Sequence, residues 1–151
     1  MEKQGRETIP ITPSLRLIPY YPAYETTLPW YQDADVCKQV DNIDHVYSLE
    51  RLEAMYTFLS THGDCFYIIY RGKPVGDVTL RDNGELAIVV SKAWQNRGIG
   101  RRCIREMLRL AKEKGGSQVT ANVYAFNAQS RKMFQSCGFR QTEAEWLVRD
   151  L

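Results

Sequence analysis

The sequence has few residues of the kinds that bind metals or form disulfides. Its 151 residues include only four cysteines and two histidines. The cysteines are scattered and form no Cys-x-x-Cys pair, and neither histidine lies at a useful spacing from them, so we expect no zinc or other metal site. The lack of a cysteine framework is typical of a reduced, cytoplasmic protein.

Long apolar runs are also absent. No stretch approaches the roughly 20 apolar residues of a membrane span, and the first ten residues lack the apolar centre of a signal peptide, so we expect no membrane association. We found no internal repeat and no low-complexity linker. Hydrophobic residues make up 44% and charged residues 25% of the chain, which is typical of a globular protein. The length then predicts one domain over residues 1–151.

Charge is nearly balanced overall but unevenly distributed. The net charge is +2, yet residues 21–60 carry seven acids against two bases, and residues 91–114 carry eight bases against two acids. Such asymmetry can mark a cationic partner for one segment and an anionic partner for the other, although solvated helix faces would give the same pattern. A pI near 8.3 and the lack of a nucleic-acid-binding motif argue against a nucleic-acid partner.

Hydrophobic periodicity and turn residues predict an alternating order of elements. Helices are expected at residues 30–39, at 48–61 with Ser48 as N-cap, from Ile99 to a stop at Gly115-Gly116, and at 127–136. Strands are expected at residues 15–20, 65–70, 75–80, 85–90, 117–124, 139–142 and 145–150. This order predicts a mixed α/β domain with one central sheet.

The segment QNRGIG, Gln95–Gly100, lies between an expected strand and an expected helix. Unpaired N–H groups at a helix N-terminus, approached closely through glycines, suit a phosphate. The segment does not fit a P-loop, which needs Lys-Ser/Thr after its last glycine. It does not fit a dinucleotide fingerprint either, because residues 91–97 separate the strand from the first glycine. A plain turn into a helix remains an alternative for the glycines alone.

A second motif lies about thirty residues downstream. NAQSRKMFQSCGF places Asn127, Ser130, Phe134 and Gly138-Phe139 in the order Asn-x-x-Ser-x-x-x-aromatic-x-x-x-Gly-Phe. Together with the Gln-x-x-Gly-x-Gly segment, this pattern resembles the GNAT superfamily of acetyl-CoA-dependent N-acetyltransferases. The resemblance implies a single domain with a twisted, mostly antiparallel central sheet of about six to seven strands and about four flanking helices. It also implies that residues 85–90 splay from residues 117–124 to receive acetyl-CoA as co-substrate.

The resemblance further implies which residues contact the coenzyme. Backbone N–H groups from Arg97 to Arg101 would hold the pyrophosphate, and a backbone N–H within Ile88–Val90 would polarise the thioester, in a segment that is equally a core strand. Asn127 is either a cofactor contact or the N-cap of its helix. The full predicted cofactor set is Ile88, Val89, Val90, Gln95, Asn96, Arg97, Gly98, Ile99, Gly100, Arg101, Asn127 and Ser130.

The acceptor side is less well defined by the sequence. An alkyl amine has a pKa near ~10 and must lose a proton before it can attack. Many members of the superfamily have a glutamate base at the start of the strand that precedes the glycine loop, and the resemblance assigns this place to Glu85. An exposed glutamate at a strand end, without a catalytic role, would give the same pattern. In the ribosomal-protein N-terminal acetyltransferases of this superfamily, a Glu that acts as the base stands at the position of Asn122. The general acid of the superfamily is usually a Tyr at the position of Phe134. Here either solvent or another tyrosine such as Tyr124 would protonate the departing coenzyme A thiolate.

Acids and aromatics in residues 21–60 suit a cationic amine, and we expect Trp30, Tyr31 and Glu85 to contact it, with core packing as the alternative for the aromatics. These patterns predict an N-acetyltransferase that acts by direct transfer to a cationic small molecule or peptide, as a monomer or homodimer. A weak or inactive acyl-CoA-binding sensor or interaction module is the alternative, and a nucleotide-phosphate binder of another fold is a third hypothesis.

Overall fold

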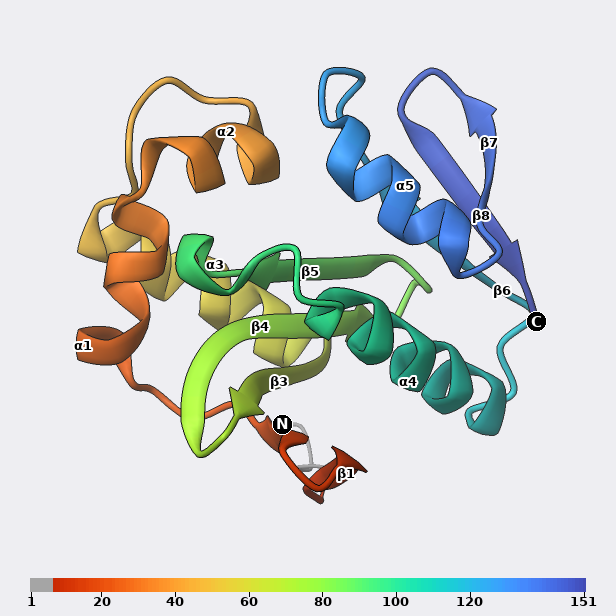
Figure 1. Ribbon diagram of the computed structural model, residues 1–151, viewed down its shortest axis with the longest axis horizontal. Helices are drawn as coiled ribbons and strands as arrows, with labels where there is room; N and C mark the ends of the chain where they lie inside the picture. Colours follow the sequence, from red (N-terminus) through yellow and green to blue (C-terminus); the bar gives the residue numbers. More distant parts are fainter. Residues whose placement is uncertain (1–6) are drawn as a thin grey trace.

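The structure is a computed structural model that describes residues 7–151 (Figure 1). Its strands are β1 (Ile9–Thr12), β2 (Leu15–Pro19), β3 (Gly63–Tyr70), β4 (Lys73–Arg81), β5 (Leu86–Val90), β6 (Gln118–Asn122), β7 (Arg140–Glu143) and β8 (Trp146–Asp150). Its α-helices are α1 (Tyr24–Thr27), α2 (Ala34–Asp41), α3 (Leu49–Thr61), α4 (Ile99–Glu113) and α5 (Ala128–Ser136), and two short 3₁₀ helices are η1 (Leu28–Gln32) and η2 (Lys92–Trp94).

The strands form two antiparallel sheets that meet at one point. One sheet has the order β1-β2-β3-β4-β5 and the other has the order β6-β8-β7. Only an isolated parallel bridge, Glu85 with Thr120, joins β5 to β6, and Figure 1 shows the two strands diverging beyond it. The predicted mixed α/β domain, its mostly antiparallel strands and their splaying are confirmed, with the expected single sheet divided at this bridge.

The structure has one strand more than the largest predicted number. β1 was not expected, because its sequence IPIT contains a proline and another proline follows it. Proline lacks a backbone donor and is tolerated in an edge strand, and β1 is the edge of its sheet, paired only with β2. The helical region expected at residues 30–39 is divided into η1 and α2 at Asp33, whose side chain accepts hydrogen bonds from Asp35 N and Val36 N.

Helices cover both faces of the five-stranded sheet, and each face has its own core. α4 packs on one face through an aliphatic core that includes Leu86 of β5 and Met107 of α4. The other face is covered by α3 and the α1–α2 segment through a core rich in tyrosine, to which Val89 of β5 belongs. Figure 1 shows α4 in front of the strands and α3 behind them. The alternation of side chains along β5 therefore places neighbouring residues in different cores.

Ser48 caps α3 as predicted, since its hydroxyl accepts a hydrogen bond from Arg51 N at 3.1 Å.

Within residues 7–151, no helix is both long enough and apolar enough to cross a membrane.

We predict that Gly76→Ala destabilises the protein by about 2–3 kcal/mol, as expected for overpacking of a core. A Cβ on Gly76 would lie 2.2 Å from the carbonyl oxygen of Val89 on β5, and backbone cannot rotate away from it. The measurement is chemical denaturation. The control is Gly72→Asn in the β3–β4 turn, where the positive φ suits Asn and no atom lies within 4 Å of an added Cβ. Equal losses in the two variants would contradict the prediction.

Candidate active site

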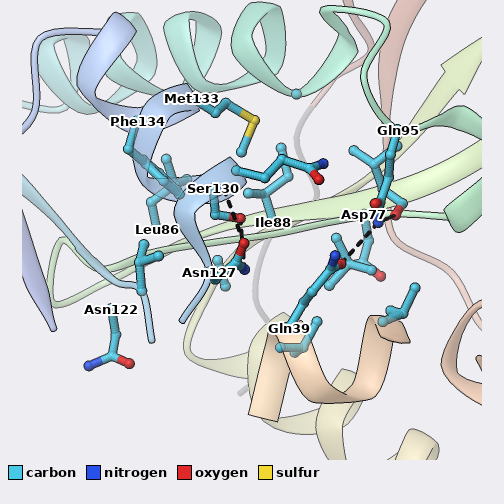
Figure 2. A pocket seen from close by; sticks show the side chains of 18 of the residues that line it. Gln39, Asp77, Leu86, Ile88, Gln95, Asn122, Asn127, Ser130, Met133 and Phe134 are labelled. Atoms are coloured by element: carbon cyan, nitrogen blue, oxygen red, sulfur yellow. Dashed lines mark hydrogen bonds between the residues drawn. The ribbon is translucent and has the colours of Figure 1, made fainter. Parts of the chain in front are cut away.

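A cavity of about 930 Å³ opens where β5 and β6 diverge. Its walls come from α2, β4, β5, the loop before α4, the first turn of α4, the end of β6 and α5. Figure 2 shows Gln95, Asp77 and Gln39 on one side of this cavity, and Asn127, Ser130 and Phe134 on the other. Most of the residues predicted from the sequence are therefore brought together in one place.

The glycine loop forms a cradle of backbone N–H groups. Asn96 and Gly98 have φ angles of 62° and 79°, in the left-handed region, and α4 begins directly afterwards at Ile99. The first N–H groups of a helix lack an intrahelical acceptor, and within residues 7–151 no protein acceptor is recorded for the N–H groups from Asn96 to Arg101. Successive unpaired donors with alternating backbone conformation suit an anion such as a pyrophosphate.

The side chains of the loop have separate roles. The Gln95 amide donates to the Gln39 side chain at 3.1 Å and to the Val90 carbonyl at 2.9 Å, so it joins the loop to α2 and β5. The Arg97 guanidinium lies over the Trp94 ring, 4.9 Å from its centroid. Gly100 packs tightly, because a Cβ there would meet the Met133 sulfur at 2.6 Å. The absence of a side chain at Gly100 therefore allows α4 to lie against α5.

The hydrogen-bonding phase of β5 determines which of its N–H groups face the cavity. Arg81 N donates to Glu85 O and Ser91 N donates to Val75 O, both at 2.8 Å. Along an antiparallel pair, opposed residues alternate between those that exchange backbone hydrogen bonds and those that do not. The backbone groups of residues 85, 87, 89 and 91 therefore form hydrogen bonds with β4. The N–H groups of Ile88 and Val90 point the other way, into the gap between β5 and β6. The backbone of Val89 is directed to β4.

Asn127 caps α5, as one of the two sequence interpretations proposed. Its Oδ1 accepts from Ser130 N at 3.1 Å, and its Nδ2 donates to Ser130 Oγ at 3.1 Å. Both side chains line the cavity. The cap therefore orients the amide and the hydroxyl at the cavity wall, where each still has capacity for one ligand contact.

Three residues considered for proton transfer from the sequence lie near the end of β6 and on α5. Phe134 is buried against the Phe139 ring and has no hydroxyl. Tyr124 lines the cavity and stacks on Phe126, and partial burial raises the pKa of its phenol. Asn122 also borders the cavity, but Figure 2 shows its amide apart from the other labelled side chains.

Glu85 borders the cavity at the start of β5. Its Oε1 accepts from Arg81 Nη1 at 3.0 Å, and about a quarter of each side chain is exposed. Its backbone N–H is held by the Asn83 side chain at 2.9 Å. The carboxylate is therefore oriented by an ion pair and remains accessible to water.

The two aromatics expected at the acceptor site lie in different places. Trp30 packs edge-on against Tyr67 in the tyrosine-rich core and is not among the residues that line the cavity. Tyr31 does line it, and its hydroxyl donates to Asp77 Oδ2 at 2.7 Å. Core packing thus describes the position of Trp30, while Tyr31 belongs both to the core and to the cavity wall.

Asp77, in the middle of β4, was not singled out from the sequence. Its side chain lines the cavity although the residue is only 3% exposed, and Oδ2 accepts hydrogen bonds from the hydroxyls of Tyr31 (2.7 Å) and Tyr56 (2.8 Å). Burial raises the pKa of this carboxyl to about 6, against the lowering effect of the two hydroxyls. The signal in the sequence was a lone acid inside the apolar strand VGDVTL.

Charged groups of both signs line the cavity. The acids are Asp41 of α2, Asp77 of β4 and Glu85 of β5, and the bases are Arg101 of α4 and Lys132 of α5. Of the seven acids in residues 21–60, only Asp41 is among them. In the part of the chain that the structure describes, no group of three or more His, Cys, Asp or Glu side chains is placed to hold a metal ion.

Comparison with known proteins identifies the family. Residues 23–139 match the model of the Acetyltransferase (GNAT) family, and the chain belongs to this family. It is 25% identical over 127 residues to human N-acetyltransferase 8, covering 76% of this chain and 51% of that protein. The chain thus spans about half the length of the curated relatives that it matches.

Two solved structures illustrate the similarity of fold. A domain from Methanocaldococcus jannaschii DSM 2661 superposes with a TM-score of 0.80 at 20% identity, covering 91% of this chain and 98% of that one. Spermidine N-acetyltransferase from Vibrio cholerae, in complex with CoA and spermine, superposes with a TM-score of 0.77 at 14% identity, covering 92% and 96%.

We predict that the free energy of unfolding of the wild type falls as pH rises from 4 to 6, and that Asp77→Asn abolishes this fall. The folded pKa is raised from 3.8 to about 6, so the unfolded chain releases its proton first and the wild type loses stability as pH rises through this window. The difference corresponds to about 3 kcal/mol. Asparagine can still accept from both tyrosines. Urea denaturation at pH 4 and pH 7 measures the effect, and the same pH dependence in both proteins would contradict it.

Proposed function

We propose that the protein transfers the acetyl group of acetyl-CoA to a primary amine of a cationic small molecule or peptide, by direct transfer in a ternary complex. The observation that carries the proposal is that one cavity runs from the N–H cradle at Gly98, past the free N–H groups of β5, to the carboxylates of Asp77 and Glu85. An anionic donor and a cationic acceptor would occupy opposite electrostatic environments of this cavity.

The residues present fit acetyl-CoA. The N–H groups from Arg97 to Arg101 would bind the pyrophosphate, assisted by the positive end of α4. The pantetheine arm would lie in the gap between β5 and β6. Asn127 and Ser130 line that gap and would hydrogen-bond the arm, since each retains bonding capacity beyond the cap.

The reacting carbonyl would lie at β5. The N–H groups of Ile88 and Val90 point into the gap, so they would stabilise the oxyanion that forms when the amine attacks. Glu85 would act as a base through water, since its carboxylate reaches solvent and is held by Arg81. The departing thiolate would take its proton from water or from Tyr124, because Phe134 has none to give.

A second candidate function is an acyl-CoA-binding module without catalysis. The observation that favours it is Phe134, which fills the place of the expected acid with an apolar ring packed on Phe139. The two functions share the cavity and its coenzyme, and they differ in whether an amine causes release of free thiol.

We predict that coenzyme A raises the melting temperature by about 5–10 °C at a concentration of 100 times its Kd, because a ligand that binds only the folded state adds about 2.7 kcal/mol at that ratio. Gly98→Ala should reduce this shift. Its Cβ meets no atom within 4 Å, but φ is +79° and an alanine there costs about 1–2 kcal/mol and distorts the cradle. Differential scanning fluorimetry with coenzyme A, ATP and NAD makes the comparison. A larger shift with ATP or NAD would contradict the proposal.

We predict that free thiol is released from acetyl-CoA in the presence of a primary amine, and that Glu85→Gln slows release by about 10²–10⁴-fold, the usual contribution of a general base. The assay uses a panel of polyamines, aminoglycosides and peptides. The control is Glu143→Gln on β7, an exposed acid outside the cavity. Coenzyme binding without thiol release across the panel would favour the second function, and an unchanged rate in Glu85→Gln would remove Glu85 as base.

A further inference from the structure

The position of Asp77 relative to the oxyanion donors is the starting point. Asp77 lies directly opposite Val89 in the register of β4 and β5, and Val89 stands between Ile88 and Val90, whose N–H groups face the gap. The Asp77 side chain is on the face of the sheet that η1 and α3 cover, because Tyr31 and Tyr56 contact it. Along the strand direction, a buried carboxylate is thus level with the point where the thioester carbonyl would lie, with β5 between β4 and the gap.

One oxygen of this carboxylate is available to a ligand. Both tyrosine hydroxyls donate to Oδ2, and within residues 7–151 no donor is recorded for Oδ1. Nor is Oδ1 among the buried side-chain atoms without a partner, so it keeps contact with the cavity that Asp77 lines. A buried carboxylate oxygen without a donor favours a cationic, hydrogen-bonding guest.

Glu85 lies farther along the sheet. Glu85 is four positions before Val89 along the chain, which corresponds to about 13 Å at the rise of a β-strand. It is also engaged by Arg81 at 3.0 Å. Asp77 is at the level of the donors along the strand, one strand away from the gap, so it is nearer in this direction than Glu85.

We propose that Asp77 binds the ammonium group of the acceptor through Oδ1 and takes its first proton, as a catalytic residue held in place by Tyr31 and Tyr56. This inference rests on the proposed N-acetyltransferase function. The neutral amine then attacks the thioester carbonyl, a C–N bond forms and the C–S bond breaks. The second proton of the nitrogen passes through water to Glu85, and the thiolate takes up one proton. Both carboxyls return their protons to solvent, so the net reaction releases one proton.

The surroundings of Asp77 also define the class of acceptor. The part of the cavity wall on the same side has apolar side chains, with polar Gln39 and Asp41 of α2 among them; the apolar residues are Tyr31, Val36, Val40, Met55 and Leu59. The apolar members of this wall suit an aliphatic chain behind the ammonium group. The inferred acceptor is therefore a primary alkylammonium, as in an alkylamine or a lysine side chain.

The groups that face Asp77 do not titrate near neutral pH. Burial raises the pKa of the Tyr31, Tyr56 and Tyr67 phenols well above their usual range and the pKa of the Cys65 thiol to about 12. The carboxyl of Asp77 itself ionises near pH 6. A base with this pKa is ionised at pH 7 and is stronger than an ordinary carboxylate.

The test is the pH dependence of kcat/KM for n-hexylamine in a thiol-release assay. With Asp77 as base, the ammonium form is the substrate, so kcat/KM should rise through about pH 6 and stay level from pH 7 to pH 9. Asp77→Asn must use free amine from solution, so its activity at pH 7.5 should fall by about 10²–10⁴-fold and then climb steadily toward pH 10. A purely structural role for Asp77 would not change the shape of the profile.

Two further variants make the test independent of how well Asp77→Asn folds. Tyr56→Phe removes a hydrogen bond that lowers the pKa of Asp77. The rise of kcat/KM at acidic pH, here called the acid limb, should therefore move to higher pH, while kcat/KM still becomes level above it. Glu85→Gln should keep the limb near pH 6 at a lower rate. The melting temperature and coenzyme A affinity of each variant check the fold and the donor site.

The outcomes separate this inference from the proposed function. If the wild type binds coenzyme A but releases no thiol with any amine, the proposed function fails. If the wild type is active, then Asp77→Asn within threefold of its rate at pH 7.5, or an acid limb that Tyr56→Phe leaves unmoved, overturns the role of Asp77. Equal activity with n-hexylamine and glucosamine would overturn the inferred acceptor class.

Discussion

The separation of β5 from β6 is the constraint on which the site depends. If the ladder continued past the Glu85–Thr120 bridge, the N–H groups of Ile88 and Val90 would be satisfied by β6 and no gap would exist. Buried backbone donors are normally paired, so an interrupted ladder creates a demand for acceptors at this point. A ligand that supplies a row of acceptors, such as an amide-containing arm, meets that demand.

Local features hold the two sheets apart on either side of this gap. On one side, Gly76 lets β4 approach the Val89 backbone closely, which keeps β5 in the first sheet. On the other, β6 pairs with β8, and the Asn127 cap begins α5 directly beyond it. Gly100 then allows α4 to contact Met133 of α5. The gap is therefore a consequence of packing on both sides and does not require a ligand to open it.

The residues that line the cavity near the glycine loop and the start of α5 could be picked out from the sequence, and the residues around Asp77 could not. Gly98, Gly100, Asn127 and Ser130 act through local backbone geometry or over three residues, so their spacing alone carried the information. Asp77 and Tyr31 are 46 residues apart, and only the packing of η1 on the sheet brings them together. Whether Trp30 lies at the acceptor site could not be read from the sequence for the same reason. Only the tertiary packing decides that the Tyr31 side chain reaches the cavity while the Trp30 ring packs in the core.

The tyrosine-rich core links stability to the chemistry of the site. Burial deprives the ionised Asp77 carboxylate of the hydration that it would have in water, and two phenol hydroxyls on one oxygen compensate only part of that loss. An ammonium group on the other oxygen would complete the compensation, because an ion pair is strongest where water is excluded. The folded protein therefore keeps a strained electrostatic arrangement that a cation relieves. An apolar residue at position 77 would avoid this desolvation cost, which binding of a cation at Asp77 would offset.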